Sequence, residues 1–266
     1  MNLLIYTHIL GVIWGNIINL QKDWQLVWHD EFDGDQLDYT KWGIEVNALG
    51  GGNNELQLYT DYPSNVRVEN GNLILEARSD SPSLMGTTRK YSSGRIRTKN
   101  RGDWKYCYLE VKAKLPAGRG MWPAIWMLPT DDKYGTWPLS GEIDIVELDG
   151  AQPNRAHGTI HYGGKWPHNQ SSGKEFVLEK ASFSDTYHVF AIRWEEDLIR
   201  WYIDGECYHT QTRWNTSSAS FPAPFDQRFH LLLNLAVGGN MVDDPDSSTQ
   251  FPQQMLVDYV RVYQRR

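Results

Sequence analysis

Four acidic side chains and no basic one occupy the ten-residue segment 141–150, GEIDIVELDG. Glu142 and Asp144 are two positions apart, so on a strand they point to one face while the intervening isoleucine points to the other. Glu147 has the wrong parity, and it joins that face only if one extra residue is inserted, as in a β-bulge near Ile145-Val146. The spacing therefore predicts three carboxyls in a row on one face of a bulged strand.

Such a row suits the hydrolysis of a glycosidic bond. Neighbouring carboxylates repel each other, which does not help folding but separates their pKa values, as is typical of functional sites. Glycoside hydrolysis needs one ionised and one protonated carboxyl at the same pH. Positions this close on one strand favour a separation of about 5–5.5 Å, the distance that belongs to retention through a covalent intermediate. The alternative is an acidic solvent-exposed strand face, which is common in antiparallel sheets.

Aromatic residues around the acidic segment favour the functional interpretation. The chain has 12 Trp and 14 Tyr, and an indole ring offers a flat apolar face with a polar N–H at its edge, which matches a sugar ring. Trp137 precedes the acidic segment, the stretch 121–128 (MWPAIWML) contains two further Trp residues, and His161 follows. The alternative for each of these aromatic residues is a place in the core.

The rest of the chain predicts the strands that must position this row. Alternating apolar and polar residues recur between turns rich in Gly, Pro, Asn and Asp, and Asp204-Gly205 is a hairpin signal. No helical periodicity lasts for three turns. We therefore expect an all-β fold, a β-sandwich or jelly roll of two antiparallel sheets with a concave substrate cleft, in a single domain over residues 23–266. The predicted strands include 72–78, 104–115, 187–194, 198–204, 229–236 and 255–263.

Composition and the N-terminal segment restrict the class of protein. The 26 basic and 33 acidic residues form no basic run, which excludes a nucleic-acid partner. Residues 3–19 are mostly apolar but too short and interrupted for a membrane span, so residues 1–22 are predicted as a signal-like or unstructured segment of a secreted protein. Nothing requires more than a monomer. The spacing of Cys107 and Cys207 leaves open whether they are bonded.

The sequence resembles glycoside hydrolase family 16, in the bulged form found in laminarinases, the endo-β-1,3-glucanases. The resemblance extends from about Trp24 to Tyr263. Besides the acidic segment, it is carried by the blocks 28–33 (WHDEFD), 53–60 (NNELQLYT), 93–96 (SGRI), 120–126 (GMWPAIW), 158–163 (GTIHYG), 234–240 (NLAVGGN) and 257–263 (VDYVRVY).

The resemblance implies a role for each matching residue. Glu142 would be the nucleophile, Glu147 the general acid/base, and Asp144 a helper that tunes the nucleophile and its proton. Further side chains would bind the substrate. Sugar rings would stack on Trp122, Trp126 and Trp137, and sugar hydroxyls would receive hydrogen bonds from Asn54, Arg95 and His161.

The resemblance also implies a structural calcium ion on the convex side, far from the cleft. Glu31, the backbone of Gly71 and Asp258 occupy the matching positions, and Ca²⁺ takes hard oxygen ligands of this kind from distant segments. No cofactor or metal is needed for the chemistry itself.

The implied activity is the retaining endo-hydrolysis of β-1,3-glucosidic bonds in laminarin-type β-glucans. One alternative is another β-linked polysaccharide, such as mixed-linkage glucan or agarose, although the extra residue before Glu147 argues against the unbulged lichenase-type members. A second is a non-catalytic β-glucan-binding protein of the same fold, although such relatives generally lack a carboxylate of the row. Laminarinases often carry Trp where this chain has Gly51-Gly52 and Met241, which bears on the number of sugar subsites.

Overall fold

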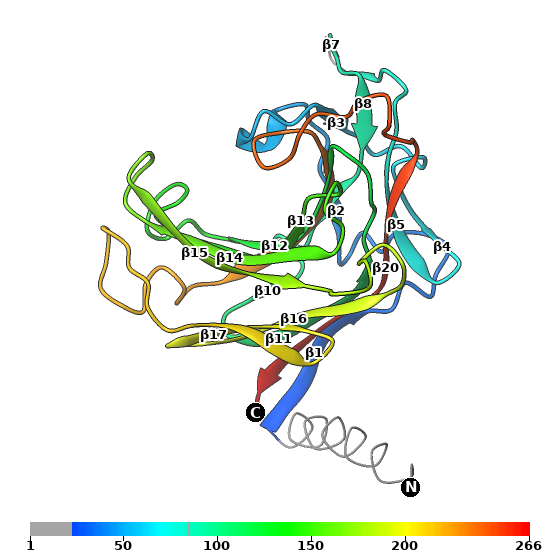
Figure 1. Ribbon diagram of the computed structural model, residues 1–266. Helices are drawn as coiled ribbons and strands as arrows, with labels where there is room; N and C mark the ends of the chain where they lie inside the picture. The colour runs from blue at the N-terminus through cyan, green and yellow to red at the C-terminus, as the bar shows by residue number, and fades with distance from the viewer. Residues whose placement is uncertain (1–22, 85) are drawn as a thin grey trace, which may run out of the picture.

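Two large antiparallel sheets form the layers of the computed structural model, which describes residues 23–84 and 86–266 (Figure 1). The predicted signal-like segment 1–22 lies outside the described residues. Within these ranges the only element besides strands is a short 3-10 turn, η1 (Gly50–Gly52), and no helix is long and apolar enough to cross a membrane. The expected all-β sandwich is confirmed.

Sheet A has the strand order β18-β17-β16-β11-β20-β5-β4, and β1 pairs with β20 at its side. In Figure 1 the first strand (blue) and the last strand (red) run side by side in this layer. Its strands are β1 (Trp24–Asp30), β4 (Val66–Glu69), β5 (Asn72–Ala77), β11 (Cys107–Lys114), β16 (His188–Glu195), β17 (Leu198–Ile203), β18 (Glu206–Gln211) and β20 (Gln253–Arg265).

Sheet B has the order β15-β14-β13-β12-β19-β9-β2, with β10 paired to β19. Its strands are β2 (Gly43–Ile44), β9 (Arg95–Arg97), β10 (Asp103–Trp104), β12 (Met121–Pro129), β13 (Glu142–Leu148), β14 (Arg155–Gly163), β15 (Asn169–Val177) and β19 (Phe229–Val237). Two small pairs complete the fold: β3 (Gln57–Tyr59) with β8 (Tyr91–Ser93), and β6 (Ser83–Leu84) with β7 (Thr87–Thr88).

The core lies between the two sheets because each strand turns every second side chain inward. In β11 the alternation is complete, and Cys107, Leu109, Val111 and Ala113 are all buried. Full burial of a large apolar side chain contributes about 1.5–3 kcal/mol, so a core of this size stabilises the sandwich without covalent links. Both cysteines are indeed free; Cys107 is buried and Cys207 is exposed.

The predicted strand 104–115 is wrong at its start, because the chain changes sheets there. β10 pairs with β19 of sheet B, whereas β11 pairs with β16 and β20 of sheet A. The two strands are separated at Tyr106, which adopts a left-handed backbone with φ of 59°. The buried positions also change parity at this point, because Trp104 is buried on an even position whereas Cys107 and Leu109 are buried on odd positions, so the period-2 pattern of β11 does not extend back into β10.

The predicted bulge is confirmed in β13. Asp144 pairs with Thr159 and Glu147 with His157, so the two residues between them on β13, Ile145-Val146, oppose the single residue Gly158 on β14. Both bulge side chains are buried in the core.

An inter-sheet hydrogen bond holds the bulged strand. The carbonyl oxygen of Asp144 accepts a hydrogen bond of 2.8 Å from the indole N–H of Trp201, a fully buried residue of β17 in sheet A. A bulge disrupts the regular ladder and bends the strand. Trp201 of the opposite sheet therefore donates a hydrogen bond to Asp144, the residue that precedes the bulge.

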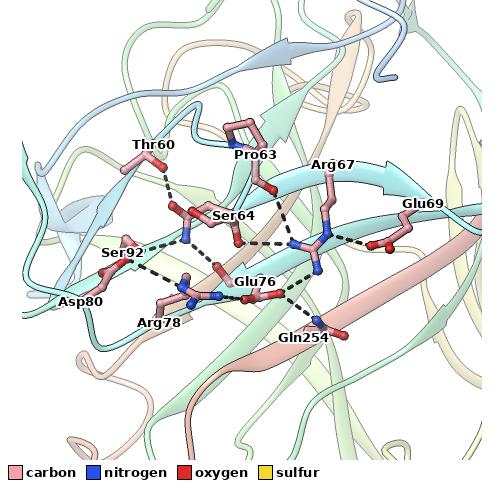
Figure 2. Close-up of polar contacts among 11 residues, drawn as sticks. Thr60, Pro63, Ser64, Arg67, Glu69, Glu76, Arg78, Asp80, Ser92 and Gln254 are labelled. Carbon is pink, nitrogen blue, oxygen red and sulfur yellow. Dashed lines mark hydrogen bonds and ion pairs between the residues drawn. The ribbon is translucent and has the colours of Figure 1, made fainter. Parts of the chain in front are cut away.

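A polar cluster joins strands β20, β5 and β4 at one edge of sheet A, and Figure 2 shows its contacts. At its centre is Glu76 of β5, which is 2% exposed and receives hydrogen bonds from Arg67, Arg78 and Gln254. Burial raises the pKa of this carboxyl, but the three donors outweigh burial and bring the pKa below its ordinary value. Asn65 then links the Glu76 backbone to β8, the partner of β3.

Gly158 provides a test of how tightly the bulge is packed. A Cβ atom at this position would lie 2.5 Å from Cδ1 of Trp201 and closer still to the hydroxyl of Tyr208. Because overpacking a tight interior costs about 1–3 kcal/mol, we expect Gly158→Ala to lower the free energy of unfolding by that amount in urea titrations. Gly34→Ala, whose nearest neighbours would lie 3.7 Å away, is the control. Equal stability of the two variants would contradict tight packing at the bulge.

Candidate active site

The bulge brings the three predicted carboxyls to one hollow on the outer face of sheet B. Glu142, Asp144 and Glu147 all line this hollow, which adjoins a larger cleft of about 680 Å³. Asp144, in the middle of the row, is only 2% exposed, whereas Glu142 and Glu147 are partly exposed. The outer two carboxyls are therefore the ones that a substrate in the cleft can reach.

Burial and mutual repulsion raise the pKa of every carboxyl in the row. Burial, reinforced by the charge of Asp144, raises the pKa of Glu142 to about 8. Burial, reinforced by the charge of Glu142, raises the pKa of Glu147 to about 7. Burial and the charge of Glu147 raise the pKa of Asp144 well above its ordinary value. The row therefore keeps protons at neutral pH, which acid catalysis requires.

Each carboxyl in the row has its own polar neighbour. The indole N–H of Trp137 donates to Oε2 of Glu142, and the indole N–H of Trp122 donates to Oε1 of Glu147 at 3.1 Å. Nε2 of His161, which faces Glu142 across the β13–β14 ladder, lies 3.2 Å from Oδ2 of Asp144. The predicted aromatic residues thus orient the acids as well as border the cleft.

The remaining predicted sugar-binding residues lie at different places around the cleft. Trp126 and Arg95 both line it, with the Arg95 guanidinium 4.9 Å from the centre of the Trp126 ring. The indole N–H of Trp126 donates to Asn234 Oδ1 at 2.7 Å. The amide of Asn54 donates to Asn240 at 2.9 Å, and it is Asn240 that borders the cleft.

Four further residues of the site were not singled out from sequence. Glu55 and Asn234 line the inner hollow, where Glu55 accepts a 2.6 Å hydrogen bond from Gln57. Glu45 forms an ion pair of 2.9 Å with Arg95. Trp166 also borders the cleft. Glu55 and Asn234 lie inside recognisable blocks, whereas Glu45 and Trp166 have no local signal because they meet the cleft only through tertiary structure.

Near Glu147 the cleft is bordered by Gly51 and Met241, at positions where laminarinases often carry Trp. Gly51 has φ of +57°, and a Cβ atom there would collide with the Glu55 carboxylate, so a side chain at this position would be strained and would have to displace that carboxylate. Met241 packs against the small cluster around Trp122. The structure therefore places no exposed aromatic ring at these two positions.

The positions implied for calcium carry carboxylates that already have cationic partners. Glu31 accepts two hydrogen bonds from Arg261, at 2.9 and 2.7 Å. Asp258 lies 2.6 Å from Nζ of Lys112. A calcium ion takes six to eight oxygen ligands, and these ion pairs occupy the charges that would attract it. A calcium ion at these positions would therefore have to displace Lys112 from Asp258 and Arg261 from Glu31.

A β-sandwich with paired carboxyls on the floor of an aromatic-lined cleft has the arrangement of a glycoside hydrolase. The comparisons are specific: residues 53–261 match the model of glycosyl hydrolases family 16. The chain belongs to that family, and the resemblance drawn from its sequence is confirmed.

Three similar proteins are named as enzymes that act on β-glucans. The glucan endo-1,3-beta-glucosidase A1 of Niallia circulans is 45% identical over 91% of this chain, which spans 38% of that protein. A beta-glucanase of Rhodothermus marinus is 42% identical, covering 90% of this chain and 85% of its own length. The catalytic domain of an endo-1,3-beta-glucanase (laminarinase) from Thermotoga petrophila RKU-1 superposes with a TM-score of 0.81 at 38% identity, covering 92% of this chain and 99% of that one.

The raised pKa values predict how stability changes with pH. The folded row holds its protons up to about pH 7–8, whereas an unfolded glutamate releases its proton near 4.5. Stability from the row is therefore fully present below 4.5 and is lost as pH rises through 7 and 8. We expect Glu142→Gln, which cannot ionise, to gain melting temperature relative to wild type as pH rises. Thermal unfolding of Glu206→Gln, an exposed control, should show no such gain; a pH-independent difference for Glu142→Gln would contradict the account.

Proposed function

We propose that this chain hydrolyses β-1,3-glucosidic bonds inside laminarin-type β-glucans, with retention of anomeric configuration. One observation carries the proposal: the bulge places Glu142 and Glu147 in one hollow, each held by a separate indole N–H. Two carboxyls on one face, with different partners, are what a double displacement needs. No cofactor is required for this chemistry.

In the first step Glu142 attacks the anomeric carbon while Glu147 donates its proton to the departing glycosidic oxygen. The pKa of Glu147, raised to about 7, keeps that proton available near neutral pH. Glu142 must lose its proton to attack, and a proton retained on the buried Asp144 removes the neighbouring charge that adds to burial in raising the pKa of Glu142, while the Trp137 N–H stabilises the resulting carboxylate. In the second step Glu147, now ionised, takes a proton from water, which attacks the glycosyl-enzyme and restores the β anomer.

The choice of β-1,3-glucan rests on the bulged strand and on the relatives. The proteins from Niallia circulans and Thermotoga petrophila are both described as endo-1,3-β-glucanases, one of them a laminarinase. Glu147 follows Asp144 by three residues, which is the bulged spacing rather than the spacing of lichenase-type members. We also propose that the protein is secreted, because a polymer of this size does not cross a membrane to reach an enzyme inside the cell.

Two alternatives are disfavoured by particular residues. A purely binding protein would not need the row, yet Glu142, Asp144 and Glu147 are all present and all have raised pKa values. A sulfated galactan would favour a basic cleft, whereas Arg95 in this cleft is paired with Glu45. Mixed-linkage glucan is the strongest remaining competitor.

Hydrolysis rates on three polymers test the proposal. We expect reducing ends to be released faster from laminarin than from mixed-linkage glucan, and none from agarose. Glu142→Gln, purified in the same way, should lose at least about a thousandfold in kcat, because the nucleophile has been removed. This variant also excludes a contaminating hydrolase. Absence of reducing ends from laminarin with folded wild-type protein would contradict the proposal.

A structural calcium ion stays a prediction from the family resemblance. Because Lys112 pairs with Asp258, calcium would have to displace this lysine, and we expect millimolar Ca²⁺ to raise the melting temperature of the wild type but not of Asp258→Asn. Differential scanning fluorimetry with Ca²⁺, Mg²⁺ and EDTA measures this. An unchanged melting temperature of the wild type would show that the protein binds no stabilising calcium ion.

A further inference from the structure

Two exposed tryptophans stand out among the residues that the structure describes. Trp137 is 41% exposed and Trp166 is 69% exposed, whereas the other tryptophans described are buried or partly buried. An exposed indole forgoes the stabilisation that burial of its large apolar surface would supply. These two lie together, with ring centres 6.1 Å apart, and both line the cleft. Their exposure is therefore concentrated at the substrate site.

The pair is fixed relative to the catalytic row. The Trp137 indole N–H donates to Glu142, which sets the direction of its ring. Trp166 lies on the turn between β14 and β15, five residues after His161, and packs against Trp137. His161 also contacts Trp137, with ring centres 6.1 Å apart. The aromatic surface thus begins at the proposed nucleophile and leads away from it on the side opposite Glu147 and Trp122.

The surroundings of Trp166 suit a sugar. Asn169, the first residue of β15, is partly exposed and lines the same stretch of the cleft, where its amide is available to a hydroxyl group. Flat apolar rings with a few polar groups at their edges are the usual composition of small-molecule and sugar sites. On the Glu147 side of the row, by contrast, Gly51 and Met241 provide no exposed ring.

The angle between the two rings indicates which chain fits. The Trp137 and Trp166 planes are inclined by 36°, so one flat ligand cannot lie against both faces. Successive glucosyl rings of a β-1,4-linked chain form a flat ribbon, whereas those of a β-1,3-linked chain turn relative to each other along a curve. An inclined pair of platforms therefore matches consecutive units of a β-1,3-linked chain.

We propose that Trp166 and Trp137 form a distal subsite that binds glucosyl units of a β-1,3-linked chain beyond Glu142, with Trp166 selecting the curved chain over a flat one. The inference rests on the proposed function, which it deepens. Trp166 acts only through substrate binding, because the catalytic carboxyls contact Trp137 and Trp122 instead.

The test compares Trp166→Ala with Tyr39→Ala, a matched change of an aromatic residue that is 63% exposed and does not line the cleft. Loss of one stacking platform should raise KM for laminarin about tenfold, with kcat within about twofold of wild type, the pattern of lost uniform binding. KM for mixed-linkage glucan should rise by a smaller factor. Tyr39→Ala should match wild type on both polymers.

A binding arm separates this inference from the proposed function. Isothermal titration of laminarihexaose into Glu142→Gln and into Glu142→Gln/Trp166→Ala should show about tenfold weaker binding by the double variant. If wild-type protein fails to cleave laminarin but the titrations differ as expected, the proposed function fails and the subsite stands. Equal affinities, an unchanged KM for laminarin, or equal rises in KM on both polymers would overturn the inference.

Discussion

The bulge in β13, with the hydrogen bond from Trp201 to the Asp144 carbonyl, is the constraint on which the site depends. Without an extra residue, a strand with strict alternation would turn Glu147 toward the core and away from Glu142. An unpaired carboxylate in the core is far too unfavourable to persist. The inserted residue instead buries Ile145 and Val146 and returns Glu147 to the outer face. The same bulge therefore fills the core with apolar side chains and places Glu147 beside the other carboxyls of the row.

The two sheets contribute differently to the site: sheet A holds the bulged strand in place, and sheet B forms the cleft. Sheet A supplies the buried Trp201 that bonds to the bulged strand, and its polar cluster around Glu76 joins β4, β5 and β20. Sheet B supplies the cleft, where the indoles of Trp122 and Trp137 hold the outer carboxyls. The repulsion within the row is tolerated because the carboxyls keep protons at neutral pH and the directed N–H groups stabilise the charge that does form. Stability given up at the row is recovered in the core between the layers.

The features of this arrangement that depend on local sequence could be predicted. The parity of Glu142, Asp144 and Glu147 required the bulge, and the structure contains it where expected. The change of sheet at Tyr106 was missed because Trp104 was assigned to the following strand, although its position is even and the buried positions of β11 are odd. The meeting of Trp137 with Trp166 was missed as well, since it joins two loops 29 positions apart in the chain. Periodicity predicts which face a side chain takes, but not which distant residue shares that face.

The central claim is that Glu142 and Glu147 act together in a double displacement on a β-1,3-linked glucan. Proton NMR of the first products from a laminarioligosaccharide tests it most directly, because the anomeric signals of the new reducing end are resolved before mutarotation mixes them. The account predicts that the β anomer appears first and the α anomer grows in later. Initial release of the α anomer would mean inversion, and the proposed roles of Glu142 and Glu147 would then be wrong.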